Sequence, residues 1–249
     1  MTLQNPPLPH PPLDWDRLAA GLDRHGVATT GIPLLDAQTC AALAALYDAP
    51  PDDGASPFRS RVVMARHGFG QGEYRYFAYP LPAIVQALRT ALYPPLAAIA
   101  GRWAAAAGSP QRWPATHAEY LAQCHAAGQT RPTPLLLRYG EGDYNCLHQD
   151  LYGEMVFPLQ AVILLSDPAR DFTGGELVLT EQRPRMQSRA EVVPLQQGEA
   201  AIFPVHHRPV QGRPVKGRRG TYRVTMRHGV SRLRSGSRHT LGIIFHDAG

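Results

Sequence analysis

Cysteine is scarce in this sequence and long apolar runs are missing, and each shortage excludes a class of protein. The 249 residues contain three cysteines, an odd number without the paired spacing of a zinc site. Neither a disulfide framework nor a cysteine-bound zinc ion is therefore expected. No apolar run approaches the length that a bilayer requires, and the first residues lack the basic and apolar segments of a secretory signal. We expect a cytoplasmic protein without a membrane partner.

Lysine is rarer still, since one lysine stands beside 24 arginines, and the positive charge is unevenly placed. Residues 183–238 hold 13 basic and two acidic residues, whereas residues 1–182 hold 12 basic and 17 acidic residues. A basic segment beside an active site attracts phosphate groups, so 183–238 is a candidate contact for nucleic acid. The alternative is that these arginines pair with acidic residues elsewhere in the chain or simply face water.

Two histidines and an aspartate are the most informative residues that are present. His148 and Asp150 are two positions apart, so on a strand both side chains would project from one face. A second histidine from a distant strand would complete two imidazoles and one carboxylate with coordination positions left open. That is the ligand set of non-haem Fe(II) oxygenases. The candidates for the second histidine are His206, His207, His228, His239 and His246.

Short apolar or β-branched runs surround His148 and continue through the second half of the chain. Gly, Pro and Asp separate these runs, a pattern that is typical of a jelly roll and not of alternating strands and helices. The runs lie at 135–139, just before His148, and at 160–165, 174–179, 198–203, 222–226 and 239–245.

The order of motifs in this half carries a family resemblance. HxD at 148–150 is followed by GGEL at 174–177, Gly-x-x-x-x-Phe at 198–203, His-Gly-Val-Ser at 228–231 and Gly-x-Arg at 236–238. Over roughly residues 134–247, this order resembles the Fe(II)/2-oxoglutarate dioxygenases of the prolyl-hydroxylase type. The resemblance implies an α+β chain with a double-stranded β-helix (jelly-roll) core and N-terminal packing helices.

Three longer strings are similar to a narrower family. They lie at 74–77, 132–137 and 183–189. That family consists of uncharacterised prokaryotic oxygenases proposed to act oxidatively on damaged nucleic acid. The resemblance implies hydroxylation of a C–H bond and suggests damaged nucleic acid as the substrate, where hydroxylation of an N-methyl group would amount to demethylation.

The resemblance also assigns the site. It selects His228 as the second histidine, because the Gly-Val-Ser turn and Arg238 follow it at the family's spacing. Fe(II) is then expected on His148, Asp150 and His228, with 2-oxoglutarate and O2 as co-substrates. The guanidinium of Arg238 is expected to clamp the distal carboxylate of 2-oxoglutarate as a bidentate pair. Thr240 shares the strand face of Arg238 and is expected to add a hydroxyl donor.

Further residues are expected around the co-substrate. Tyr139 precedes His148 by nine positions, where related dioxygenases often place a tyrosine near the co-substrate; a core tyrosine is the alternative. Gln160, Val162 and Leu164 share a strand face that is expected to line the pocket. Related enzymes can place a tyrosine near Leu164, and this chain has none there. Cys146 is two residues before His148, so its side chain is expected on the same strand face. It is expected either to line the cavity or to be an unreactive packing residue.

The chain is expected to divide into a flexible proline-rich lead at 1–13, a helical N-terminal region at 14–131 and the dioxygenase core at 132–249. Residues 58–79 suggest strands and turns. The predicted helices span 14–25 with a stop at Gly26, 37–47 with Asp36 as cap, 82–107 with a break near Pro94 and Pro95, and 114–127 with an end at Gly128.

Alternatives to nucleic-acid oxidation stay open on the sequence. One is a prolyl-type hydroxylase of protein side chains, another acts on a small molecule, and a third is a cupin-like metal-binding sensor or isomerase without 2-oxoglutarate. Residues 183–238 contain only two aromatic residues, Phe203 and Tyr222, which counts against a rich base-stacking platform in that segment. The loop 182–189 is the expected determinant of selectivity. The oligomeric state is not predicted.

Overall fold

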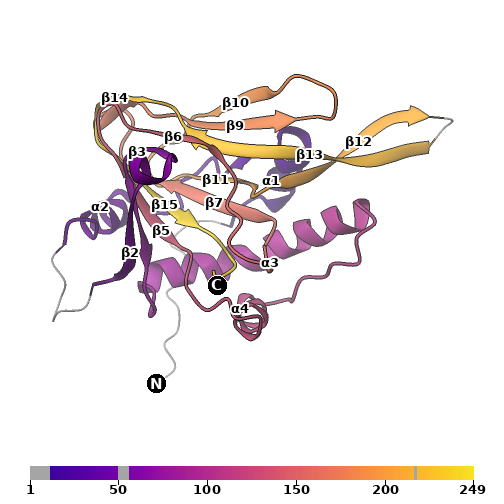
Figure 1. Cartoon of the computed structure of the whole chain (residues 1–249), viewed down its shortest axis with the longest axis horizontal. Helices are drawn as coiled ribbons and strands as arrows, with labels where there is room; N and C mark the ends of the chain where they lie inside the picture. The colour runs from indigo at the N-terminus through magenta and orange to yellow at the C-terminus, as the bar shows by residue number, and fades with distance from the viewer. Residues whose placement is uncertain (1–11, 50–55, 216–217) are drawn as a thin grey trace.

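Two antiparallel sheets pack against each other in the computed structural model, which describes residues 12–49, 56–215 and 218–249 (Figure 1). The chain is thus a mixed α and β protein. The larger sheet has seven strands in the order β1 (Ala28–Thr29), β11 (Ala200–Pro204), β7 (Leu159–Leu164), β15 (Arg238–Ile243), β5 (Leu135–Tyr139), β4 (Glu73–Phe77) and β2 (Phe58–Val63). The proline-rich lead falls almost wholly outside the described residues.

The smaller sheet has six strands. Its order is β10 (Arg189–Val193), β9 (Leu177–Gln182), β13 (Arg218–Val230), β6 (Tyr144–His148) and β3 (Gly70–Gln71), and β12 (His207–Val215) pairs with β13. Two short strands, β8 (Phe172–Gly174) and β14 (Leu233–Gly236), form a separate pair. The predicted strands are all present, whereas β1, β8, β10, β12 and β14 were not predicted.

Apolar side chains between the two sheets form one of the hydrophobic cores. Leu164 and Phe203 of the larger sheet meet Leu179, Val224 and Met226 of the smaller sheet there. Because residues two positions apart on a strand share a face, polar residues in step with these apolar ones, such as Gln160 on β7 and His228 on β13, line a cavity in the same interior. That interior is where the candidate site lies.

Four helices cover the other face of the larger sheet: α1 (Trp15–His25), α2 (Ala37–Ala45), α3 (Ala83–Ala106) and α4 (His117–Ala126). Asp14 caps α1 by accepting a hydrogen bond from the Arg17 amide, and Asp36 does the same for α2 through Thr39. Both caps satisfy amides that a first turn leaves without partners. The predicted helices are therefore confirmed, and α4 starts at His117 behind a Thr116–Glu119 capping box, slightly later than predicted.

The predicted break in α3 is wrong. The helix continues through Pro94 and Pro95, although a proline there removes a backbone hydrogen bond and crowds the preceding turn. Buried residues on both sides of the pair, such as Leu92 and Leu96, anchor the helix in the core behind the larger sheet. This tertiary packing outweighs the local preference for a break.

The sequence also led us to expect no segment long and apolar enough to cross a bilayer. This is wrong, because α3 reaches the necessary length and apolar composition. More than half of its most apolar window is buried inside the protein, at 56%. Figure 1 shows α3 lying along the body of the fold, as a core helix does. The N-terminal region also supplies β2 and β4 to the larger sheet, and the division of the chain at residue 132 stays a prediction.

Candidate active site

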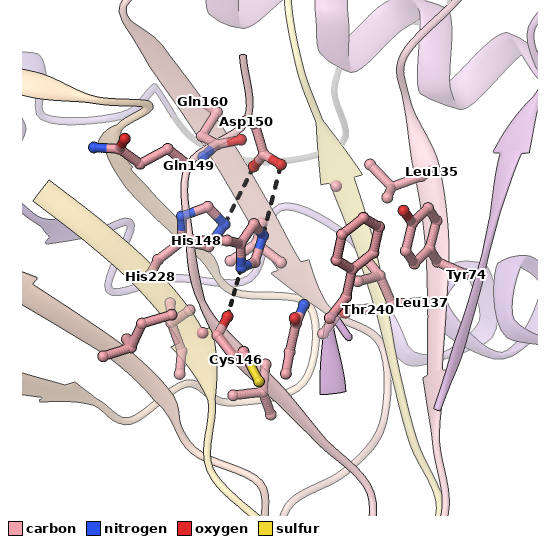
Figure 2. Close-up of a pocket in the computed structure, with 18 of the residues that line it drawn as sticks. Tyr74, Leu135, Leu137, Cys146, His148, Gln149, Asp150, Gln160, His228 and Thr240 are labelled. Carbon is pink, nitrogen blue, oxygen red and sulfur yellow. Dashed lines mark hydrogen bonds and ion pairs between the residues drawn. The ribbon is translucent and has the colours of Figure 1, made fainter. Parts of the chain in front are cut away.

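The structure brings His148, Asp150 and His228 together between the two sheets (Figure 2). His148 ends β6, and His228 on β13 is its register partner, so the two imidazoles lie side by side with ring centroids 4.2 Å apart. Asp150 lies two residues beyond the end of β6, so it is not on the strand as the spacing had suggested. The backbone pairing of β6 with β13 thus sets the distance between the two histidines.

The three side chains can hold one metal ion. Asp150 Oδ2 lies 3.2 Å from His228 Nε2, and Asp150 Oδ1 lies 3.6 Å from His148 Nε2. One ligand atom from each residue lies within 4.8 Å of the other two. Nitrogen and oxygen donors sit about 2.0–2.2 Å from a divalent ion, so adjacent ligands around one ion are roughly 3 Å apart. The two distances from Asp150 to the histidines are close to this spacing, so small shifts of the side chains would let all three bind one ion.

Hydrogen bonding prepares His148 as a ligand. Its Nδ1 lies 2.7 Å from the carbonyl oxygen of Cys146 and donates to it, which leaves the lone pair of Nε2 directed toward Asp150. Burial, and then the nearby His228, lower the pKa of His148. The neutral imidazole that binds a metal is therefore the favoured form.

Asp150 is buried and remains ionised. Burial acts to raise the pKa of its carboxyl group, but His228, His148 and a hydrogen bond from Tyr152 outweigh burial and hold that pKa well below its usual value. The Tyr152 hydroxyl donates to Asp150 Oδ1 at 2.7 Å. Oδ2, which faces His228, is left available to a metal.

A cavity of about 330 Å³ opens beside these three residues. Its walls come from both sheets: β4, β5, β7 and β15 on one side, β6 and β13 on the other. Figure 2 shows Thr240, Leu137 and Tyr74 on the far side of this space from His148 and His228. A metal on the three candidate ligands would therefore face a cavity with room for a small organic acid and part of a substrate.

Arg238 reaches this cavity as a buried cation without a partner. The residue is 3% exposed, its Nη1 has no hydrogen-bond partner, and the described residues offer it no ion pair. Burial lowers the pKa of the guanidinium to about 10. The group stays charged at neutral pH, flanked by the rings of Tyr139 and Phe172 at 5.7 and 5.8 Å. A buried charge of this kind calls for an anionic ligand.

Gly175 lies against the side chain of Arg238. The sequence suggested only a turn at Gly174 and Gly175, and both have positive φ angles, which favour glycine. A Cβ at Gly175 would also lie 3.1 Å from Cδ of Arg238. Gly175 therefore makes room for the side chains of Leu233 and Arg238 as well as for the turn.

Most of the other residues predicted to surround the co-substrate line the cavity, but Leu164 does not. Tyr139, Gln160, Thr240 and Val162 line the cavity, as does Cys146. The Tyr139 hydroxyl accepts a hydrogen bond from Asn145 at 3.3 Å, whereas the amide nitrogen of Gln160 is buried without a partner. Leu164 does not line the cavity; it packs in the core between the sheets.

Among the cavity residues that sequence reasoning missed, three aromatic ones stand out. Tyr152 carries no motif of its own beyond its place two residues after Asp150. Tyr74 lies in the string at 74–77 that resembles the narrower family, which was its only signal. Phe69 reaches the cavity from a loop of the N-terminal region, and nothing in the local sequence indicated this.

The basic segment is partly neutralised. Three of its arginines, Arg183, Arg189 and Arg208, converge on the buried carboxylate of Glu181, so for them the pairing alternative is correct. Arg185, Arg223 and Arg227 are exposed and have no ion pair within the described parts of the chain. The side chains at 213–219 lie outside the description.

Comparison with known proteins places the chain in a family. Residues 72–248, more than half of the chain, match the family described as "Oxygenase, catalysing oxidative methylation of damaged DNA". The chain belongs to this oxygenase family. The narrower resemblance predicted from the sequence is thereby confirmed.

The chain is also similar to proteins of several bacteria. An uncharacterised protein of Mycobacterium tuberculosis, found in two strains, is 52% identical over 172 residues, which cover 69% of this chain and 72% of the relative. An oxidoreductase of the 2OG-Fe(II) oxygenase family from Burkholderia pseudomallei aligns with a TM-score of 0.53 at 16% identity, covering 94% of this chain and 93% of that one. The likeness shows a shared fold. A prolyl-4-hydroxylase from Pseudomonas putida aligns with a TM-score of 0.47 at 16% identity, covering 94% and 100%.

Tyr152 gives a first testable prediction for this oxygenase. Replacing it with phenylalanine removes the hydrogen bond that orients Asp150, so we expect the affinity for a divalent metal to fall by about 10- to 100-fold. Titration of the metal-free protein with Co(II), followed by its visible absorption, measures this affinity. Tyr93→Phe is the matched control, because the hydroxyl of Tyr93 is buried without a partner and lies away from the cavity. Equal affinities in both variants would contradict the role of Tyr152.

Proposed function

We propose that the protein is an Fe(II)- and 2-oxoglutarate-dependent dioxygenase whose two sheets form a double-stranded β-helix and whose substrate is damaged nucleic acid. The observation that carries the reaction class is the buried, unpartnered guanidinium of Arg238 in the same cavity as His148, Asp150 and His228. Two imidazoles and a carboxylate suit Fe(II), and the arginine suits a dicarboxylate that also reaches the metal.

Iron and 2-oxoglutarate would supply the oxidation, and the residues of the site would position them. With O2, the iron and 2-oxoglutarate supply an oxidation that forms succinate and CO2 and inserts one oxygen atom into a C–H bond of the substrate. His148 and His228 would hold the metal through Nε2, and the Tyr152 hydroxyl bonds Asp150 Oδ1 so that Oδ2 would be free for the same ion. The cavity beside these residues is where co-substrate and oxygen would enter.

The co-substrate is held by residues of the larger sheet. Arg238 binds its distal carboxylate, and Thr240, two residues further along β15, presents its hydroxyl to the same cavity. Tyr139 packs beside the guanidinium and limits where the carboxylate can lie. Gln160 offers a buried amide that lacks a protein partner and is free to donate to a bound ligand. The apolar walls around these groups exclude water.

Damaged nucleic acid is the proposed substrate for two reasons. The family is described by an activity on damaged DNA, and several exposed arginines of the basic segment form no ion pair among the described residues. Hydroxylation of an N-methyl group gives a hydroxymethyl group that leaves as formaldehyde, so the site is suited to removing a methyl group from a base. A base inside a duplex is out of reach, so a single-stranded or extruded base is the form expected to react.

Substrate-stimulated turnover tests the proposal. Succinate formation by the Fe(II)-loaded protein should rise on addition of single-stranded DNA with N-methylated bases, with formaldehyde released in equal amount. Unmethylated DNA of the same sequence and a proline-rich peptide are the controls, and His228→Ala sets the background. Stimulation by the peptide alone would replace the proposed substrate with a protein side chain. No 2-oxoglutarate binding at all would favour a cupin-like protein.

A further inference from the structure

The mouth of the cavity carries an exposed aromatic ring that the proposed reaction does not use. Phe69 lines the cavity, yet 47% of its surface is exposed. Its ring stacks on that of His67, with centroids 5.3 Å apart and an interplanar angle of 23°. Leu147, on β6 just before the candidate ligand His148, is also exposed and lines the same cavity. Exposed apolar side chains gathered at a cavity are typical of a contact surface.

The backbone holds Phe69 in a fixed position relative to the metal ligands. The 3-10 turn η1 (Met64–His67) ends at Gly68 in the left-handed region, and the Phe69 amide donates back to the Met64 carbonyl. The Phe69 carbonyl accepts from the Cys146 amide at 2.9 Å, beside the end of β6 that carries His148. A Cβ at Gly70 would collide with the Tyr144 carbonyl, so only glycine allows this close approach.

Two arginines belong to the segments next to Phe69. Arg66, three residues before Phe69, is exposed and has no acidic partner among the described residues. Arg232 lies over the ring of Tyr144 at 5.0 Å, and Tyr144 is the register partner of Gln71 in β3. Arg232 donates to the Gly142 carbonyl and likewise has no ion pair in the described part of the chain. Arg66 in η1 and Arg232 beside Tyr144 of β6 therefore both belong to segments that adjoin the strand pair holding Phe69, and neither is neutralised by an ion pair among the described residues.

We propose that Phe69, supported by His67, is a stacking platform for one base of a single-stranded nucleic acid, with Arg66 and Arg232 contacting its phosphates. The proposal rests on the proposed nucleic-acid substrate and specifies how that substrate is held. An exposed ring flanked by arginines matches the combination of π-face and phosphate that a nucleotide presents. A peptide would need only apolar contact at this position, which an aliphatic side chain also supplies.

The experiment therefore compares an aliphatic with an aromatic side chain at position 69. Fluorescence anisotropy of a labelled thymidine 12-mer measures binding to the metal-free full-length protein at low salt. Compared with the unaltered protein, Phe69→Leu should weaken binding by about 5- to 150-fold, the usual loss for one stacked base, whereas Phe69→Trp should bind as well or better. An oligomer of abasic sites of the same length is the second probe, and Phe69→Leu should leave its weaker binding unchanged.

The outcomes separate this proposal from the proposed function. Full binding by Phe69→Leu, or an equal loss for the thymidine and abasic probes, overturns the platform and leaves a nucleic-acid substrate in place. Absence of thymidine 12-mer binding to the unaltered protein at low salt overturns both. Unchanged Co(II) affinity in the Phe69 variants shows that the fold and the metal ligands are intact, which is expected because the side chain is exposed.

Discussion

Replacing Arg238 with glutamine is expected to lower the affinity for 2-oxoglutarate by between about 30-fold and a few thousand-fold, the usual loss when one member of a buried charge pair is removed. The reason is that this guanidinium is the cation that faces the cavity without a protein partner among the described residues. Glutamine keeps some hydrogen-bonding capacity but has no charge. Isothermal titration of the metal-loaded protein with 2-oxoglutarate measures the change.

The same variant should keep its metal and its stability. Arg238 does not contact the three candidate ligands, so Co(II) affinity should not change. In the ligand-free protein the burial of an unpaired charge is unfavourable, which is why the pKa of this arginine is lowered to about 10. The melting temperature of Arg238→Gln should therefore equal or exceed that of the unaltered protein. Unchanged 2-oxoglutarate affinity would remove the basis for the proposed reaction class.

Replacing Arg89 with methionine is expected to have the opposite effect on stability. Arg89 is also fully buried, but it pairs with the buried Asp247 at 2.7 Å and donates to the carbonyls of Ile244 and His246. Removing one member of a buried pair leaves the other charge buried, which costs about 3–5 kcal/mol of unfolding free energy. Urea unfolding of Arg89→Met should show a loss of this size.

An exposed pair provides the control for Arg89. Arg61 pairs with Glu73, and more than half of the arginine side chain is exposed. Because solvent screens such a pair, Arg61→Met should change the unfolding free energy by less than about 1 kcal/mol. Equal losses of unfolding free energy in the two variants would show that Arg89 does not stabilise residues 244–247, which it contacts. These residues follow β15, the strand that carries Arg238 and Thr240.

The sequence predicted the ligand set because the relevant information is local or tied to motifs. His148 and Asp150 are two positions apart, and the turn after His228 fixed the choice among five histidines. Their meeting depends on the register of β6 with β13, which joins segments 80 residues apart and has no local signal. The roles assigned to these residues stay predictions until metal binding is measured.

Long-range packing decided what the sequence could not show. The prolines of α3 indicated a break, but the buried neighbours of Pro94 and Pro95 keep the helix continuous. Arginines that looked free in the basic segment converge on Glu181, which stands just outside that segment in the chain. The exposed aromatic ring at the cavity mouth, Phe69, comes from the N-terminal region, because η1 and β3 fold against β6.

The most direct test of the account is an anaerobic absorbance titration of the metal-free protein with Fe(II) and then 2-oxoglutarate. If His148, Asp150 and His228 hold the iron and Arg238 orients the co-substrate, a visible charge-transfer band should appear on addition of 2-oxoglutarate. The band should require far more co-substrate in Arg238→Gln and be absent in His228→Ala. Iron that is bound by the unaltered protein without any such band would contradict the central claim.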